Sequence, residues 1–171
     1  MDQNLKTKLA SIRLLALDFD GVLTDGHVYV DEAGRESVRA SRRDGMGIAM
    51  LQRAGVEVAV ISREENPVVA ARCKKLQVLC MQGIATGEGK AQILLRLMQE
   101  RGITREAVAY MGDDVNDLGA LSAAGVPLAV RDADPAVQRA ACYITERNGG
   151  KHAVREVCNI ILEAKDIKPS Y

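Results

Sequence analysis

The sequence predicts an α/β protein built on a doubly wound parallel sheet, with helices on both faces and a β-hairpin inserted after the first strand. Of the 171 residues, 47% are hydrophobic, 15 are glycine and 3% are aromatic, a composition typical of a compact α/β protein. Short apolar runs alternate with helical patterns along the chain. A repeated strand–helix order predicts parallel strands joined by right-handed crossovers.

Near-continuous apolar runs mark the predicted strands, as expected when both faces of a sheet are covered. The stronger runs are residues 13–19, 56–62, 107–113 and 126–130. Two weaker candidates are residues 77–82 and 142–145.

Helical patterns fill the intervals, and residues that begin or end helices punctuate them. The first runs from Asp44, a candidate N-cap, to Ala54, before Gly55. Others begin at Asn66-Pro67 and Asp134-Pro135, end at Gly102, or follow the Gly-Gly turn near the end of the chain.

Residues 27–41 break the alternation. They form two alternating runs around a glycine-containing turn, which predicts a β-hairpin directly after the first strand. No repeat or linker interrupts the rest, so we expect one domain over residues 1–171.

Charge and cysteine content indicate which kinds of partner and which cellular compartment to expect. Lys plus Arg and Asp plus Glu both number 23, so net charge indicates neither a nucleic-acid nor a membrane-surface partner. Neither a secretory signal nor a membrane-spanning run is evident, and the cysteines are scattered without metal-ligand spacing. We therefore expect a reduced, cytoplasmic protein with free thiols at Cys73, Cys80, Cys142 and Cys158.

Polar residues follow several of these strands at the edge where ligands bind in open α/β sheets. They are Asp18, Asp20, Ser62, Lys90, Asp113 and Asp114. Since Asp18 and Asp20 are two residues apart on a strand end, they share a face and repel each other when ionised. A Mg²⁺ ion would neutralise that repulsion.

This set of residues favours phosphoryl transfer. One carboxylate can attack phosphorus to form an aspartyl-phosphate, and a second can protonate the leaving oxygen and then activate water. Each residue alone has an ordinary structural explanation: a strand terminus for D-x-D, a solvated lysine, a turn for GDDVND. The EF-hand ligand spacing is absent from that last motif.

The motifs DFDGVLTDG, Ser62, Lys90 and GDDVND resemble the four motifs of the haloacid dehalogenase superfamily. The resemblance implies that Asp18 is the nucleophile and Asp20 the general acid/base. It implies phosphate binding by Ser62, Lys90 and Gly21, and metal binding by Asp18, Asp113 and the backbone carbonyl of Asp20. Asp114 and Asp117 would hold the metal ligands and Lys90 in position without binding the substrate.

A narrower resemblance covers nearly the whole chain. DGVLTDG, RRDGMGI, MQG, VAYMGDDVND and GGKHAVREVC are similar to the 3-deoxy-D-manno-octulosonate 8-phosphate (KDO 8-phosphate) phosphatases, a group that includes nine-carbon sugar acid 9-phosphate phosphatases. The intervals between motifs leave no room for a cap domain. The likeness implies a small sugar acid phosphate as substrate, and a homotetramer associating through the 27–41 hairpin. The alternative is a hairpin folded over its own sheet.

Two departures from this group bear on the substrate. SREEN stands where KDO 8-phosphate phosphatases usually carry Thr-Gly-Arg, and His152 replaces a usual glycine. The candidate substrate contacts are Arg43, Arg63, Glu64 and Lys75. Glu64 favours a nine-carbon acid, whereas the common occurrence of the eight-carbon pathway favours KDO, so both stay open.

Two further function classes compete with the phosphatase. A non-catalytic oligomerisation module for a cytidylyltransferase predicts a broken catalytic set, but the set is intact here. A signalling receiver predicts its phospho-accepting aspartate after the third strand, whereas D-x-D follows the first.

Overall fold

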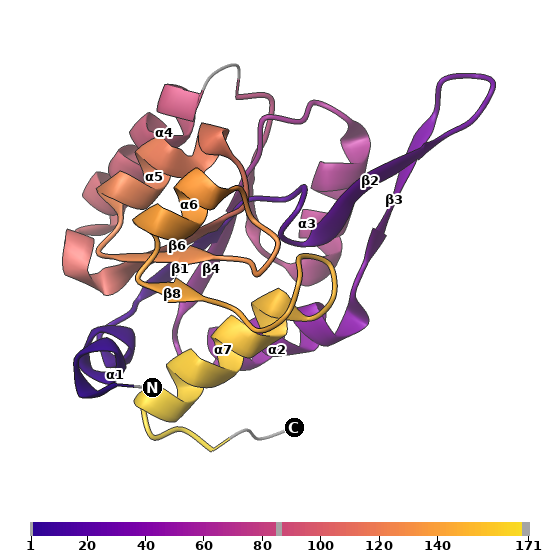
Figure 1. The fold of residues 1–171 in the computed structure, drawn as a ribbon. Helices are drawn as coiled ribbons and strands as arrows, with labels where there is room; N and C mark the ends of the chain where they lie inside the picture. Colours follow the sequence, from indigo (N-terminus) through magenta and orange to yellow (C-terminus); the bar gives the residue numbers. More distant parts are fainter. Residues whose placement is uncertain (1, 85–86, 169–171) are drawn as a thin grey trace.

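The computed structural model describes residues 2–84 and 87–168, which form a six-stranded parallel sheet covered by helices (Figure 1). The strand order is β5-β4-β1-β6-β7-β8, and each neighbouring pair is parallel. The strands are β1 (Leu14–Leu17), β4 (Glu57–Ile61), β5 (Leu79–Met81), β6 (Val108–Gly112), β7 (Val126–Ala129) and β8 (Tyr143–Ile144). The predicted fold class is confirmed.

The helices form two layers, with α1, α2 and α7 on one face of the sheet and α4, α5 and α6 on the other (Figure 1). Their bounds are α1 (Gln3–Ala10), α2 (Arg42–Arg53), α3 (Pro67–Leu76), α4 (Gly87–Arg101), α5 (Leu118–Ala123), α6 (Pro135–Ala140) and α7 (Ala153–Ala164). Two 3₁₀ turns are η1 (Arg105–Ala107) and η2 (Val115–Asp117). No helix within the described ranges has both the length and the apolar character of a membrane span.

Strand order reverses at β1, which lies between β4 and β6. The chain first winds from β1 through β4 to β5, then returns to the other side of β1 as β6. This reversal opens a crevice beyond the carboxyl ends of the strands, where open α/β sheets bind ligands. All four residues of β1 are fully buried, so the chain leaves a rigid core at Leu17 and presents Asp18 at the crevice.

Helix starts follow the expected capping chemistry with one correction. Asn66 accepts a hydrogen bond from the backbone of Val68 at the start of α3, as predicted. Helix α2, however, begins at Arg42 with Ser41 as its N-cap, so the N-cap prediction for Asp44 was wrong. Ser41 lies one turn earlier and has the extended backbone that a cap requires.

Helix α1 was not predicted. Only two of its residues, Leu5 and Leu9, are buried, so its apolar periodicity is weak. Asp2 caps it, and it packs against α7. Tertiary contact with the end of the chain stabilises this helix more than its own sequence does.

Strands β2 (Thr24–Val30) and β3 (Glu36–Ala40) form the inserted hairpin, which begins three residues earlier than predicted. The hairpin projects away from the body of the molecule (Figure 1) and forms a sheet of its own. Val28, Tyr29 and Val30 are 50%, 64% and 59% exposed. The alternative in which the hairpin folds over its own sheet is therefore wrong.

Candidate active site

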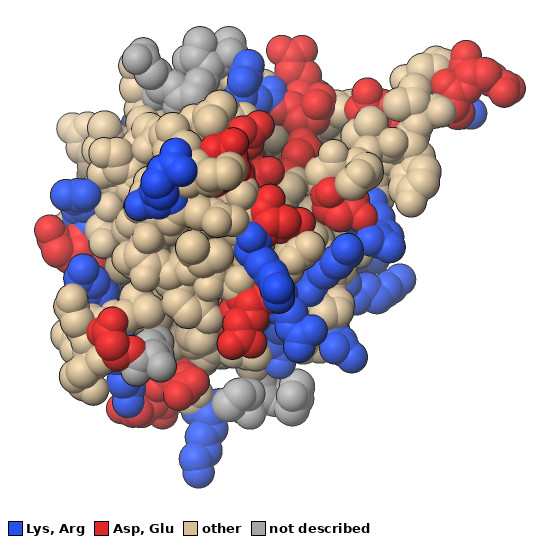
Figure 2. Space-filling view, in the orientation of Figure 1, with Lys and Arg blue, Asp and Glu red and all other residues tan. Residues whose placement is uncertain are grey.

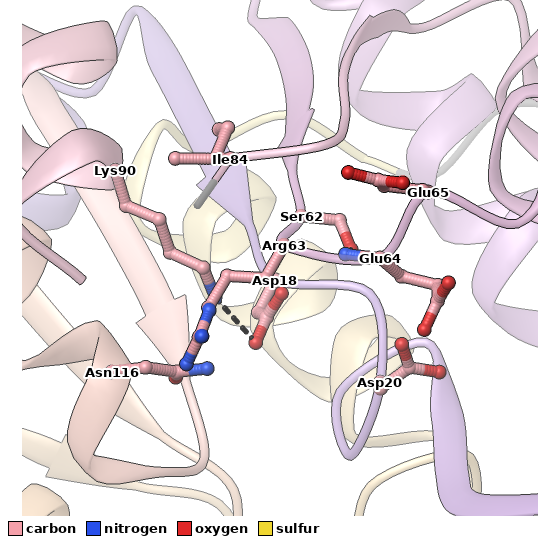
Figure 3. A pocket seen from close by; sticks show the side chains of 9 residues that line it. All are labelled: Asp18, Asp20, Ser62, Arg63, Glu64, Glu65, Ile84, Lys90 and Asn116. Atoms are coloured by element: carbon pink, nitrogen blue, oxygen red, sulfur yellow. Dashed lines mark hydrogen bonds and ion pairs between the residues drawn. The ribbon is translucent and has the colours of Figure 1, made fainter. Parts of the chain in front are cut away.

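A cavity of about 520 Å³ lies beyond the carboxyl ends of β1 and β4 (Figure 3). Its lining combines residues from loops that are distant in sequence. They are Asp18, Asp20, Ser62, Arg63, Glu64, Glu65, Ile84, Lys90 and Asn116. The predicted nucleophile, general acid, hydroxyl and lysine thus share one cavity.

Lys90 is the centre of the charge network in this cavity. Its side chain has no exposed surface, and Nζ lies 2.8 Å from Asp18 Oδ2 and 2.8 Å from Asp117 Oδ1. A buried ammonium is stable only when it is paired and hydrogen-bonded, and two carboxylates supply both conditions here.

The pKa shifts of the pair follow from burial and neighbouring charge. Burial raises the pKa of Asp18 well above its usual range and the Asp117 carboxylate raises it further, whereas Lys90 lowers it. Burial alone would lower the pKa of Lys90, but Asp18 and Asp117 raise it above its ordinary value. Lys90 therefore stays charged, and its charge helps to keep Asp18 available as a carboxylate nucleophile.

Asp117 holds Lys90 in position. Its Oδ1 accepts hydrogen bonds from Lys90 Nζ at 2.8 Å and from the hydroxyl of Tyr110 at 2.7 Å. Its Oδ2 accepts from the backbone N–H groups of Asp113 and Asp114 at 2.9 and 3.4 Å. Because both oxygens are occupied, Asp117 is suited to orienting Lys90, in line with the supporting part that the resemblance implies.

Ligand atoms of Asp18, Asp113 and Asp117 lie within 4.8 Å of one another. Asp117 accepts two hydrogen bonds on each oxygen. Asp18 accepts one on each, from Lys90 and from the Phe19 backbone, so it keeps acceptor capacity for a cation. A Cβ on Gly21 would collide with the Asp113 carboxylate, so glycine allows the backbone that follows Asp20 to lie against Asp113. Carboxylate and carbonyl oxygens suit Mg²⁺, and the residues present therefore fit that ion.

Asp113 carries the signature of a carboxyl group crowded by like charge. Burial, followed by the Asp117 and Asp114 carboxylates, raises its pKa to about 7. A bound divalent cation favours the ionised form and would lower this pKa again.

Asp20 has the environment of a general acid. Its carboxyl Oδ1 accepts a hydrogen bond from the Thr24 hydroxyl at 3.3 Å. Burial raises the pKa of Asp20; the Thr24 bond opposes this shift, and the nearby Glu64 carboxylate adds to it. A raised pKa increases the protonated fraction that can supply a proton to a leaving group.

Ser62 directly follows β4 and lines the cavity. The side chain is buried, and Oγ accepts a hydrogen bond from the backbone N–H of Glu64 at 3.1 Å. Glu64 in turn accepts from the backbone of Asn66 at 2.8 Å, at the entrance to α3. The Ser62 O–H is thereby left to donate toward a phosphoryl oxygen.

The structure separates the four candidate substrate contacts. Arg63 and Glu64 line the catalytic cavity, whereas Arg43 lines another cavity and Lys75 is exposed on α3. Gly21 does not line the catalytic cavity either, and its N–H donates to Thr24 Oγ1 at 3.3 Å. Gly21 is better explained by its close approach to Asp113, which a side chain would block, than by phosphate binding.

The site residues that the sequence did not indicate include Thr24, Tyr110 and Asn116. Thr24 and Tyr110 position Asp20 and Asp117 through their hydroxyls. Asn116 lines the cavity, and its Oδ1 is buried with no partner among the residues described. Tyr110 has a visible signal, an aromatic residue with a polar end inside an aliphatic strand.

Asp114 supports the loop rather than the cavity. Its side chain caps η2, where Oδ1 accepts from the backbone N–H of Val115 at 2.7 Å, and Asp117 completes a capping box. The cap fixes the turn that carries Asn116 and Asp117.

Comparison with known proteins gives a consistent result. The family model of haloacid dehalogenase-like hydrolases matches residues 61–157. The 3-deoxy-D-manno-octulosonate 8-phosphate phosphatase KdsC of Salmonella typhi is 37% identical over 165 residues, which cover 95% of this chain and 85% of that protein. KdsC of Haemophilus influenzae is 38% identical over 162 residues, 94% of this chain and 88% of its own.

Solved structures agree with the sequence relatives. The KDO 8-phosphate phosphatase of Moraxella catarrhalis, solved with magnesium, phosphate and KDO, superimposes with a TM-score of 0.90 at 34% identity, covering 96% of this chain and 94% of that one. The Yersinia pestis phosphatase gives a TM-score of 0.92 at 35% identity, with 97% and 89% covered.

Proposed function

This chain belongs to the haloacid dehalogenase-like hydrolase family, and on that premise we propose that it is a Mg²⁺-dependent phosphatase that hydrolyses KDO 8-phosphate to KDO and phosphate. One observation carries the proposal: Asp18, Asp20, Ser62 and Lys90 line a single cavity, with Lys90 paired to Asp18 at 2.8 Å. The names of the relatives supply the substrate.

In the first step the Asp18 carboxylate attacks phosphorus and the bond to the sugar oxygen breaks. Asp20 gives its proton to that leaving oxygen, and an aspartyl-phosphate remains on Asp18. Lys90 and the Ser62 hydroxyl bind the phosphoryl oxygens while charge builds on them.

In the second step Asp20, now ionised, takes a proton from water as the water attacks phosphorus. The bond between phosphorus and the Asp18 oxygen breaks, and phosphate leaves with the Asp18 carboxylate restored. Thr24 holds Asp20 in both steps through its 3.3 Å hydrogen bond.

The carboxylates of Asp18 and Asp113 and the backbone carbonyl of Asp20 would hold the metal. When bound, Mg²⁺ would supply positive charge against the phosphoryl oxygens and the clustered carboxylates.

The length of the sugar acid is tested by a direct competition. Specificity constants, kcat/KM, are measured for KDO 8-phosphate and for a nine-carbon acid 9-phosphate under one set of conditions. We expect the eight-carbon substrate to be favoured at least about tenfold, a difference that one extra polar contact can produce. Equal constants, or a preference for the longer acid, would reassign the substrate and direct attention to Glu64.

We also infer that copies of the chain associate through the hairpin, as a homotetramer, in the cytoplasm. Support for association comes from Val28, Tyr29 and Val30, whose exposed surfaces would be covered by another copy. The free thiols of all four cysteines support a reducing compartment.

A further inference from the structure

The base of the hairpin carries a second cavity, of about 470 Å³, separate from the catalytic one. We call it the basic cavity. The end of β3, the start of α2 and the turn before α7 form its walls, and Figure 2 shows blue side chains gathered around the hairpin base. Its polar lining consists of Arg39, Ser41, Arg42, Arg43, Lys151 and His152.

Hydrogen bonds between segments far apart in sequence fix these walls. Ser41 Oγ accepts from the backbone N–H groups of Arg43 and Asp44 at 3.1 and 3.4 Å, and lies 2.9 Å from His152 Nδ1. The Ser41–His152 contact ties the start of α2 to the turn before α7. Asp44 adds a second tie by accepting from the backbone of Arg155 at 2.8 Å.

The cavity holds an excess of unpaired positive charge. Arg39 is neutralised by Asp25, with Nη2 and Oδ2 2.7 Å apart. The side chains of Arg42, Arg43 and Lys151 make no hydrogen bond or ion pair within residues 2–84 and 87–168. Three cations around one hollow repel one another, and an anion placed between them would relieve that repulsion.

We propose that the basic cavity binds a small anion carrying both a phosphate and a carboxylate group. Two guanidinium groups offer planar forks that match these groups, and Lys151 adds a point charge. The volume lies in the range of small-molecule sites. The only ring among the lining residues is the imidazole of His152, which contacts Ser41, so the row of stacking rings that single-stranded nucleic acids use is missing.

The site goes beyond the proposed function, yet it lies against the catalytic loop. The Gly150 N–H donates to the carbonyl of Val22 at 3.0 Å, and a Cβ on Gly149 would collide with the carbonyl of Gly21. Lys151 follows directly. An anion held by Lys151 therefore sits next to the turn that braces the loop carrying Asp20.

The test uses phosphonoacetate, a non-hydrolysable probe that carries a phosphonate and a carboxylate. Calorimetric titration of the full chain with Mg²⁺ present compares the unaltered protein with an Arg42→Ala/Lys151→Ala double variant. We expect the double variant to lose at least about tenfold in affinity for one class of sites, because two charge-assisted contacts are gone. The loss should shrink as salt is raised.

Arg139→Ala is the matched control, since Arg139 is exposed and lies away from the basic cavity. It should bind like the unaltered protein, and the double variant should keep its melting temperature and its kcat/KM. Equal affinity in all three proteins would overturn the proposal, because the probe would then occupy only the catalytic cavity. A hairpin-tip peptide of residues 29–37 that outcompetes the probe would also overturn it, in favour of a protein partner.

Discussion

The catalytic edge of the sheet and the hairpin both follow β1 in the chain, but they differ in how their side chains are covered. Charged side chains at the catalytic edge are buried and paired, whereas apolar side chains of the hairpin are exposed. At the edge, Lys90 is fully buried between Asp18 and Asp117, and each charge has a partner at 2.8 Å. In the hairpin, Tyr29 is 64% exposed and the two strands pair only with each other.

The difference shows where each region obtains its missing contacts. The edge takes them from inside the chain, since loops after β1 and β6 and the start of α4 converge there. The hairpin has fewer such neighbours: β3 contacts α3, where Asn66 Nδ2 donates to Glu36 Oε2 at 3.2 Å, but the exposed part of the hairpin lacks this support, and an isolated two-stranded hairpin is marginal in water. We expect another copy of the chain to cover the exposed apolar side chains of the hairpin.

Replacing Asp18 with Asn is expected to have the largest effect on activity. Without a nucleophile, kcat should fall by at least about 10⁴-fold, as for other residues that form covalent intermediates. The melting temperature should not fall, because Lys90 keeps its contact with Asp117. The matched substitution in the hairpin, Asp31→Asn, should leave kcat unchanged. Activity that persists in the Asp18 variant would show that the nucleophile is misassigned.

Lys90→Met tests how far the edge depends on its internal partners. The change leaves two buried carboxylates facing each other, so the free energy of unfolding should fall by about 3–5 kcal/mol. Arg35→Met, which breaks the exposed pair with Asp31, should cost far less stability, because solvent screens that pair. Urea titration measures both. Similar losses in the two variants would contradict the contrast between edge and hairpin.

Deleting residues 28–38 tests the hairpin's dependence on other copies. Light scattering should report smaller assemblies, and kcat/KM should fall by at least about tenfold, since a neighbour no longer helps to exclude water from the site. The melting temperature of the core should change little. A tetramer that persists after the deletion would show that the hairpin is not needed for assembly.

The stability of the metal-free protein should also depend on pH. With EDTA present, the folded state holds a proton on Asp113 up to about pH 7, whereas the unfolded chain releases it near the ordinary value of about 4. The folded state then binds more protons, so stability falls as pH rises through that window. Mg²⁺ should restore the melting temperature increasingly toward higher pH.

Thermal melts between about pH 5 and pH 8, with and without Mg²⁺, measure this effect. Asp113→Asn should flatten the slope and abolish most of the Mg²⁺ response. An unchanged slope in that variant would assign the titration to another group, and an enzyme indifferent to both EDTA and Mg²⁺ would remove the metal from the mechanism.

Much of the fold could be predicted from the sequence, because the patterns that indicate strands and helices lie within short segments. Apolar runs locate all six strands of the sheet, and motifs at the strand ends locate Asp18, Ser62 and Asp113 at one edge. The alternation with helices predicts that the strands are parallel, but the strand order is known only from the structure. Features that depend on neighbouring residues in the sequence can therefore be predicted from the sequence alone.

What escaped prediction depends on distant contacts. Tyr110 matters because Asp117 lies within 2.7 Å of its hydroxyl, and helix α1 exists because α7 covers it. Lys90 alone reads as a solvated residue and is buried only because two carboxylates meet it. Asp44 reads as a cap for its own helix but accepts from Arg155, on another.

The contact between Gly149 and Gly21 has a consequence for synthesis. Asp18 and Asp20 are synthesised about 130 residues before Gly149 and Gly150, the backbone that braces their loop. On a growing chain these two carboxylates are therefore present before their loop can be braced, and we expect full activity only after residues 149–150 have been added.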